Sequence, residues 1–255
     1  KKMIDKLNID DIKPSSRRYP AIIFDTEREA GDQILEIKNL EKTKDGELLF
    51  SKIDLNLKKG DKVAVLSKNS LAITEFFEVL AGNVTADKGE FNWGITTNQS
   101  YMPLDNNSFF FFFINLVDWL RQFTKNDDER HEEYMRGFLG KMLFSGDEAL
   151  KSCKVLSGGE KMRCMFSRMM LQRANVLLMD EPTNHLDLES ITTLNNSLTN
   201  FKGTILLSSH DHEMLETVCN RVIELTPKGI IDRQMTYDEY LDDKKIKELQ
   251  QQMYS

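Results

Sequence analysis

Residues 176–187 read VLLMDEPTNHLD and carry the clearest structural signal in the chain. Four apolar residues lead directly into Asp180 and Glu181, which is typical of a strand buried on both faces that ends in two carboxylates. The first acid of such a pair can hold Mg²⁺, and the second can orient or deprotonate the water that attacks a γ-phosphate. We therefore predict a metal ligand at Asp180 and a catalytic base at Glu181. The simpler alternative is an ordinary strand leaving a core, so the surroundings of this stretch must decide.

A Ser-Gly-Gly turn lies upstream of those acids. Leu156 is followed by Ser157, Gly158, Gly159 and Glu160, and then by an amphipathic segment over residues 161–172. Glycines allow close backbone approach, and the free amides and dipole of a helix N-terminus favour an anion. The pattern therefore predicts a phosphate contact at this turn, whereas its simpler interpretation is a helix cap.

A histidine follows an apolar strand pattern downstream. His210 comes directly after residues 204–209, which read TILLSS. A lone histidine is usually structural, but one at the end of a strand can hydrogen-bond a γ-phosphate and the attacking water. We predict that His210 acts catalytically beside Glu181.

The remaining patterns predict an α/β fold. Strands are expected at residues 34–40, 53–57, 62–66, 176–179, 204–208 and 221–225, with helical segments between the later ones, as in a parallel sheet with crossover helices. Residues 106–172 read as a mainly helical insert. We expect the end of a linker at 1–33, one domain at 34–235, and a helical tail at 236–255 that extends outside the core.

Composition excludes several classes of protein. The chain of 255 residues carries 41 acidic and 34 basic side chains, a net charge of -7, so no global basic field draws it onto nucleic acid. Its three cysteines form no metal-ligand spacing and suit a reducing compartment. The longest wholly apolar run is far below the roughly 18 residues that span a bilayer, and no signal peptide opens the chain. We therefore expect a cytoplasmic protein without membrane insertion.

The ordered set of motifs resembles the ABC ATPase superfamily. Residues 156–163 read LSGGEKMR and residues 180–187 read DEPTNHLD, wording that is most similar to the ABC-F branch. The resemblance implies a P-loop core of the RecA type, with an antiparallel β subdomain and a helical signature subdomain. It makes residues 156–160 the signature motif, Asp180 and Glu181 part of Walker B, Asp187 the D-loop acid and His210 the switch histidine.

The phosphate-binding loop departs from that family pattern. A P-loop reads G-x-x-x-x-G-K-[ST], because its glycines expose amides and its lysine neutralises phosphate oxygens. Here Ser67 and Ala72 replace glycines and Ile73 replaces the lysine. The nucleotide-binding candidates that remain in this degenerate Walker A are Ser67, Lys68, Asn69, Ser70 and Thr74, and Thr74 is also a candidate Mg²⁺ ligand.

Two further nucleotide-contacting positions look altered. Lys44 takes the place of the adenine-stacking aromatic, and Leu104 takes that of the Q-loop glutamine, with Gln99 displaced toward the strand. These changes predict weak or absent nucleotide binding at the chain's own loop. The run of phenylalanines at residues 109–113 fits neither a strand nor a helix period, and its simplest interpretation is a partly buried surface loop.

The resemblance implies a two-domain ATPase that uses ATP and Mg²⁺. A second ABC domain would supply the ATP that Ser157, Gly158, Gly159 and Glu160 contact, and the ribosome and tRNA would be partners. Two alternatives stay open: the ATPase subunit of a membrane transporter, and a catalytically inert scaffold. The wording DEPTNHLD and Leu104 weigh against the transporter, Ile73 favours the scaffold, and Glu181 and His210 favour retained chemistry.

Overall fold

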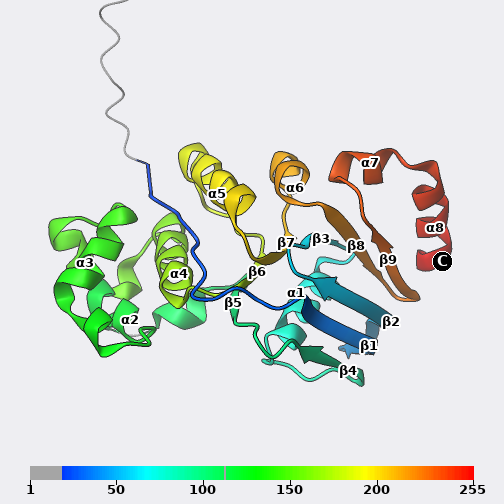
Figure 1. Cartoon of the computed structure of the whole chain (residues 1–255), viewed down its shortest axis with the longest axis horizontal. Coiled ribbons are helices and arrows are strands. Elements are labelled where there is room, and N and C mark those ends of the chain that lie inside the picture. The colour runs from blue at the N-terminus through cyan, green and yellow to red at the C-terminus, as the bar shows by residue number, and fades with distance from the viewer. Residues whose placement is uncertain (1–18, 112) are drawn as a thin grey trace, which may run out of the picture.

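The computed structural model describes residues 19–111 and 113–255. Within them the chain forms one six-stranded sheet, one three-stranded sheet and a helical subdomain, arranged side by side (Figure 1). The α/β architecture expected from the sequence is confirmed. Residues 1–18 of the expected linker lie outside the described part of the chain.

The six-stranded sheet carries the predicted motifs. Its strand order is β5-β6-β7-β3-β8-β9, and all neighbours run parallel except the antiparallel pair β8–β9. The strands are β3 (Lys62–Leu66), β5 (Gln99–Met102), β6 (Val176–Asp180), β7 (Thr204–Ser208), β8 (Arg221–Thr226) and β9 (Gly229–Arg233). Because parallel strands end at one edge of a sheet, this order brings the residues that follow β3, β6 and β7 together.

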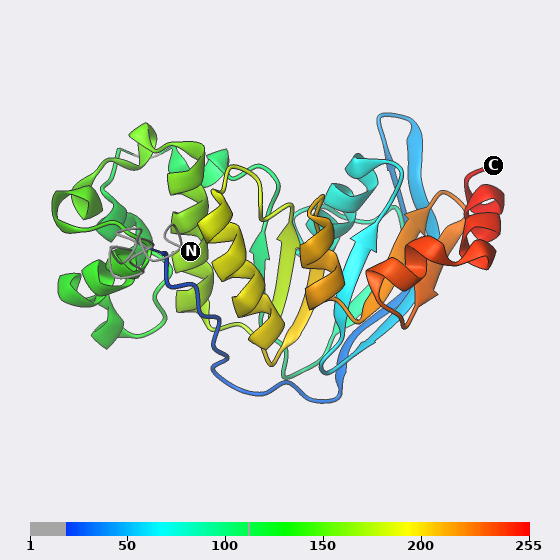
Figure 2. The ribbon, with the colours of Figure 1, turned by 90° about the horizontal axis from the view of Figure 1, so that it is seen from above.

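The two faces of this sheet belong to two separate cores. Leu177 and Met179 point into the first core, which contains α5 (Leu188–Asn200) and α6 (His212–Val218). Leu178 and Leu206 point into the second core, which contains helix α1 (Ser70–Leu80) and the second sheet. Figure 2 shows α5 and α6 side by side over the strands. Burial on both faces explains why β6 reads as a continuous apolar run.

The second sheet is antiparallel, with strand order β2-β1-β4. Its strands are β1 (Gln33–Lys44), β2 (Glu47–Lys58) and β4 (Lys88–Trp93). Strand β2 buries alternate residues, as a sheet with one solvated face should. The turn between β1 and β2 holds Asp45 and Gly46 at φ of 51° and 83°, a left-handed conformation that glycine and aspartate accept readily.

Residues 107–172 form the helical subdomain, at the end of the molecule opposite the three-stranded sheet (Figure 1). Its elements are η2 (Asn107–Phe110), α2 (Leu116–Arg121), η3 (Asp127–Arg130), α3 (Glu132–Lys141), η4 (Gly146–Leu150), η5 (Cys153–Val155) and α4 (Gly158–Gln172). Met162, Met165, Phe166 and Met169 of α4 are buried against the first core, which matches their predicted helical spacing.

Both ends of the described chain pack onto the domain. Ile22 and Phe24 are buried, and the Phe24 ring makes edge contacts with Phe166 and Phe201. The tail forms α7 (Tyr237–Asp242) and α8 (Lys244–Tyr254). The expectation that this tail extends outside the core is wrong, because Tyr240 and Ile246 are each only 1% exposed and belong to the first core.

Candidate functional site

The ends of β6 and β7 and the start of α1 meet at a buried carboxylate. Asp180 accepts hydrogen bonds from the Thr74 hydroxyl at 2.7 Å and from the Ser208 hydroxyl at 2.7 Å, and it is 3% exposed. Burial raises the pKa of Asp180, and the two hydroxyl donors oppose that rise. The two predicted magnesium ligands, Thr74 and Asp180, are therefore in direct contact, and oxygen ligands of this kind suit Mg²⁺.

Glu181 lies at the sharp turn that follows β6. Its φ of 51° is left-handed, an uncommon value for a residue other than glycine, and its amide donates to the Ser208 carbonyl at 3.1 Å. The carboxylate accepts from the backbone amide of His210 at 3.1 Å, and the His210 Nε2 atom lies 3.5 Å from Glu181 Oε1. The structure thus brings together both residues that were predicted to be catalytic.

Glu181 and His210 differ in their surroundings. Burial raises the pKa of Glu181, while the amide and ring of His210 act in the opposite direction. The Glu181 side chain is 12% exposed, whereas that of His210 is 89% exposed. The pair therefore presents a shielded carboxylate beside an imidazole that reaches into solvent.

The phosphate-loop segment is closed by its own hydrogen bonds. The Leu71 amide donates to the Asn69 side chain at 3.0 Å, because Asn69 is the N-cap of α1. The Asn69 amide donates to the Ser67 hydroxyl at 3.3 Å, and the Lys68 amide donates to the Tyr254 hydroxyl at 3.0 Å. In a P-loop such amides point at phosphate oxygens. In this structure the amides of Lys68, Asn69 and Leu71 have acceptors within the chain instead.

The side chain at the P-loop lysine position and that of the nearby Lys68 both make contacts within the chain. Ile73 packs against the second core, and the Lys68 ammonium lies 4.2 Å from the centroid of the Tyr254 ring. The ammonium therefore faces an aromatic ring of the tail. Ser70 is the first residue of α1, so the predicted nucleotide contacts at residues 67–70 and at Thr74 all lie between β3 and the first turns of α1.

A cavity of 340 Å³ separates this loop from the catalytic pair. Its lining includes the predicted residues Ser67, Lys68, Glu181 and His210, together with Ile73. Residues that sequence reasoning missed complete the wall: Tyr237, Tyr240, Leu241 and Gln250 from the tail and Glu224 from β8. The four tail residues were signalled in the sequence by helical spacing, but such spacing does not indicate which surface a helix covers.

The Ser-Gly-Gly turn forms the N-terminus of α4. Ser157 is the N-cap, its hydroxyl accepts from the Glu160 amide at 3.3 Å, and Glu160 accepts from the Ser157 amide at 2.8 Å. Lys151 also donates to Glu160 at 2.8 Å. Burial favours the neutral acid, but the bonds from Lys151 and Ser157 prevail and lower the pKa of Glu160 to about 2. Glu160 is therefore held as an anion by its own turn.

His185 explains why glycines occupy this turn. A Cβ atom on Gly158 would lie 2.9 Å from His185 Cγ, and a Cβ on Gly159 would lie 2.9 Å from the His185 carbonyl oxygen. These approaches are too close for any side chain, so the glycines are required by packing as well as by any ligand. The signature and the D-loop are thus adjacent in space.

Asp187 has a structural role at the start of α5. It is the N-cap of that helix and accepts from the Ser190 amide at 2.8 Å, which lowers the pKa of the carboxyl group. Neither Asp187 nor the signature residues Ser157, Gly158 and Gly159 line the cavity beside Glu181. The structure therefore divides the predicted site residues into two groups.

The other sequence expectations have clear locations. Lys44 makes an ion pair with Glu75 of α1, and Leu104 is 45% exposed. In the phenylalanine run, Phe110 is buried and stacks on Trp119 with ring centroids 5.0 Å apart, whereas Phe111 and Phe113 are 71% and 80% exposed. The prediction of a partly buried loop agrees with these exposures.

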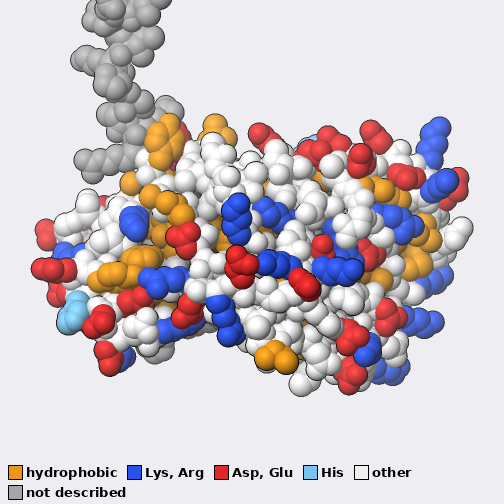
Figure 3. All heavy atoms as spheres, viewed as in Figure 1, with side chains coloured by type: hydrophobic (Ala, Val, Ile, Leu, Met, Phe, Trp, Pro, Cys, Tyr) orange, Lys and Arg blue, Asp and Glu red, His pale blue; other side chains and the backbone are white. Residues whose placement is uncertain are grey.

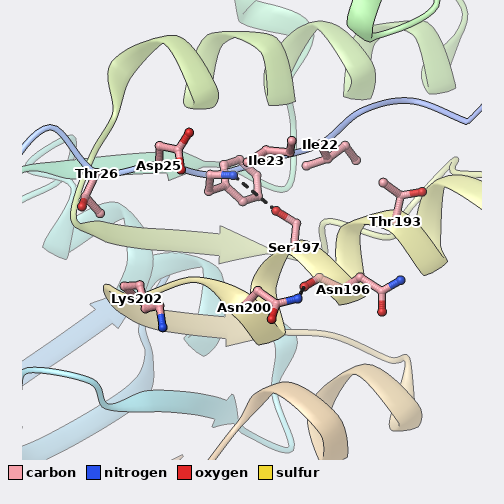
Figure 4. Close-up of a pocket in the computed structure, with 10 residues that line it drawn as sticks. Ile22, Ile23, Asp25, Thr26, Thr193, Asn196, Ser197, Asn200 and Lys202 are labelled. Carbon is pink, nitrogen blue, oxygen red and sulfur yellow. Dashed lines mark hydrogen bonds between the residues drawn. The ribbon is translucent and has the colours of Figure 1, made fainter.

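A further cavity is lined by other residues. It measures 680 Å³ and lies between residues 22–26 and the polar face of α5 (Figure 4). The Phe24 amide donates to the Ser197 hydroxyl at 3.3 Å across its floor. None of the predicted site residues lines it, so its size does not make it the functional site.

Other kinds of site are not evident in the described residues. Within residues 19–111 and 113–255, no three His, Cys, Asp or Glu side chains form a group that could hold a metal ion. None of the helices in that part of the chain is long and apolar enough to cross a bilayer. Acidic and basic side chains are mixed over the face in Figure 3, without a field of one sign.

The parallel sheet, the strand-end carboxylates and the capped Ser-Gly-Gly helix together define a nucleotide-binding domain of the P-loop class. Residues 50–184 match the family described as ABC transporter. The chain therefore belongs to the ABC family of ATP-binding domains.

Comparison with known proteins agrees with this assignment. The chain is 50% identical to the uncharacterized ABC transporter ATP-binding protein YkpA of Bacillus subtilis, over 100% of the chain and 47% of that protein. It is 29% identical to ABC transporter F family member 5 of Arabidopsis thaliana, over 98% of the chain and 37% of that protein. The chain thus spans half or less of the length of these relatives.

A solved structure shows the same fold. It is a dimeric ATP-binding cassette in a post-hydrolysis state bound to ADP and Pi, with a TM-score of 0.66 and 16% sequence identity over 79% of this chain and 99% of that one. The expected RecA-type core with its antiparallel β subdomain and helical subdomain is confirmed. The chain is therefore an ABC ATPase domain, and domains of this family bind ATP.

Proposed function

We propose that this chain is one half of a tandem ABC-F ATPase and that its signature turn completes an ATP site on the other half. The observation that carries this proposal is the contrast between the two anion-binding elements. The N-terminus of α4 is exposed at Ser157 and Gly158, and its capping box engages the amides of Ser157 and Glu160 rather than those of Gly158 and Gly159. In the phosphate-loop segment, the amides of Lys68, Asn69 and Leu71 already have acceptors within the chain. An exposed helix N-terminus attracts a phosphate, and amides that already have acceptors are less able to bind one.

The lengths and names of the relatives support the tandem arrangement. YkpA is about twice as long as the region that matches it, which leaves room for a second domain. The F family name of the Arabidopsis relative supports the ABC-F branch. In the proposed dimer, Ser157, Gly158 and Gly159 would face the terminal phosphate of ATP held by the partner domain, with Glu160 fixing the turn.

The chain's own strand-end cluster would have a lesser catalytic role. Thr74 and Asp180 are the proposed holders of Mg²⁺, Glu181 the proposed base and His210 the proposed orienting group. Because the amides of Lys68 and Leu71 in the adjoining loop already have acceptors within the chain, we propose weak or absent hydrolysis at this site.

Turnover in the full-length protein tests the proposal. Ser157→Arg should lower ATP turnover at least about tenfold, because it fills the turn that faces the partner's phosphate. Glu181→Gln should lower turnover by much less. A Glu181→Gln effect as large as that of the same change in the other half would contradict this asymmetry.

Ser145→Arg is the matched control for Ser157→Arg. Ser145 is likewise an exposed N-cap in the helical subdomain, and its amide donates to Glu148 as that of Ser157 donates to Glu160. Both changes remove a similar cap, so their effects on stability should be alike. Equal losses of turnover in the two variants would show that folding, not the proposed contact, is responsible.

Ribosome association is the finer part of this proposal. We propose ATP-dependent binding to ribosomes, with tRNA as a neighbouring partner, in the cytoplasm. Sedimentation of the full-length protein through a sucrose cushion with ATP should place it with ribosomes. Recovery with membranes instead would favour a transporter ATPase, as the name of the YkpA relative suggests.

An inert scaffold is the second candidate that a specific observation favours. The internally bonded segment at residues 67–71 supports it, because a domain without its own phosphate loop can still close on a partner. Under this alternative, Glu181→Gln would leave turnover unchanged, and Ser157→Arg would weaken dimer closure alone.

A further inference from the structure

We infer that the C-terminal helix α8 is an internal stopper of the chain's own phosphate loop, with the Tyr254 hydroxyl in the position of a phosphate oxygen. The inference rests on the proposed function in one respect, because it takes residues 67–74 as the phosphate-loop segment. It goes further by naming what occupies that segment. The occupant is part of the same chain and lies 186 positions from Lys68 in the sequence.

The hydroxyl of Tyr254 links two strand ends. It accepts from the Lys68 amide at 3.0 Å and donates to the Leu225 carbonyl at 3.0 Å. The Ser67 hydroxyl donates to the same Leu225 carbonyl at 2.9 Å. A phosphate oxygen would be held by the Lys68 amide in the same way, so the tyrosine and a phosphate compete for one donor.

The ring of Tyr254 engages the nearest cation. The Lys68 ammonium lies 4.2 Å from the ring centroid, which is within the range of a cation–π contact. Burial raises the pKa of the Tyr254 hydroxyl to about 12, so the group stays protonated and can donate to Leu225 at neutral pH. Both the amide and the ammonium of Lys68 are thereby turned away from an incoming anion.

A buried carboxylate fastens the helix in this position. Glu224 of β8 is 4% exposed and accepts from the Tyr240 hydroxyl and the Gln250 amide, each at 2.6 Å. Ile246 adds an apolar anchor at 1% exposure, and Lys228 donates to the Gln252 carbonyl at 3.2 Å. Figure 2 shows α8 at the end of the molecule that carries β8 and β9. These contacts lie along the whole helix, so Tyr254 is held over the loop.

The consequence is that nucleotide can reach this loop only when the end of α8 moves away. The loop that contains the altered residues Ser67 and Ile73 is then closed by a protein group instead of a ligand. Gln250 of the same helix lines the cavity of 340 Å³ beside Glu181.

Amide exchange of Lys68 in the full chain, read by NMR without nucleotide, tests the stopper. Tyr254→Phe removes the acceptor but keeps the ring and its contact with Lys68. It should speed exchange of the Lys68 amide about fivefold or more, the size expected for one lost hydrogen bond. Tyr237→Phe, which alters a hydroxyl in the wall of the same cavity, should leave this rate unchanged.

A second variant separates the tether from the hydroxyl. Gln250→Ala keeps Tyr254 but removes a bond to Glu224, so it should also speed Lys68 exchange, by a smaller factor. Fast exchange of this amide in the unaltered chain, or no change in Tyr254→Phe, would overturn the inference.

Titration with Mg²⁺-ATP tests whether Tyr254 limits the access of nucleotide to the loop. The Lys68 resonance should shift at a several-fold lower ATP concentration in Tyr254→Phe than in the unaltered chain. Equal midpoints, or no shift in either chain, would overturn Tyr254 as the barrier. The proposed function fails separately, through the Ser157→Arg comparison and the ribosome sedimentation, neither of which depends on α8.

Discussion

Thr74 donates its hydroxyl to Asp180 across 2.7 Å, although the two residues are 106 positions apart in the sequence. The bond joins the second turn of α1 to the end of β6 inside the molecule. It leaves Asp180 with two hydroxyl donors, and it places both proposed magnesium ligands in one contact. This relationship defines the position of the strand-end cluster.

Removing the Thr74 hydroxyl should destabilise the fold. Thr74→Val keeps the shape of the side chain but takes a donor from a buried carboxylate, which costs roughly 1.5–3 kcal/mol when the acceptor is charged. Urea unfolding followed by circular dichroism measures the change. Thr74→Ser retains the hydroxyl and should recover most of the loss; an unchanged stability in Thr74→Val would contradict a stabilising role for this hydrogen bond.

Neutralising Glu181 should stabilise the fold at neutral pH. Burial raises the pKa of this carboxyl above its usual 4.5, so the protonated form favours folding below about that pH, and this contribution is lost as pH rises through the folded value. Glu181→Gln should therefore raise the melting temperature at pH 7, and the gain should vanish below pH 4.5. Glu90→Gln, at an exposed position of β4, should show no such trend.

Glu160 should give the opposite pH dependence. Its bonds lower the folded pKa to about 2, so its contribution to stability is present above the usual value of 4.5 and is lost as pH falls toward 2. Glu160→Gln should cost about 1 kcal/mol at pH 7, the size of a capping interaction, and less in acid. Lys151→Met should reproduce part of this trend. A cost that does not depend on pH would contradict the ionised capping box.

Gly158 and His185 should be energetically coupled. Gly158→Ala places a methyl group 2.9 Å from His185 Cγ, and overpacking of this kind costs roughly 1–3 kcal/mol. His185→Ala removes the obstacle, so the double variant should be more stable than the sum of the single changes predicts. A double-mutant cycle by chemical unfolding measures the coupling. Strict additivity would show that the turn relaxes without moving His185.

Neighbouring phenylalanines should respond very differently to truncation. Phe110 is buried and stacks on Trp119, so Phe110→Ala should cost roughly 3–5 kcal/mol. Phe111 is 71% exposed, and Phe111→Ala should change stability by less than about 0.5 kcal/mol. Urea unfolding measures the free energy of unfolding of both variants. Similar losses would show that Phe111 also makes stabilising contacts within the isolated chain.

The fold class and the order of the motifs could be predicted from local sequence patterns. Strand-like runs such as β6 and β7 were predictable because burial on both faces requires continuous apolar residues. Parallel pairing then brings their carboxyl ends together, so the meeting of Asp180, Glu181 and His210 was predictable as well. The departures at Ser67 and Ile73 were also visible, since a P-loop tolerates few residue types.

The surface that each end of the chain covers could not be predicted in this way. The spacing of Tyr240, Ile246 and Leu249 predicted a helix, but helical period states which residues share a face and not what that face meets. The bonds of Tyr254 to Lys68 and of Gln250 to Glu224 join residues far apart in sequence, and they depend on how α8 returns over β8. The contact of His185 with the signature glycines has the same origin. Such long-range contacts arise from packing in three dimensions, which local sequence patterns do not encode.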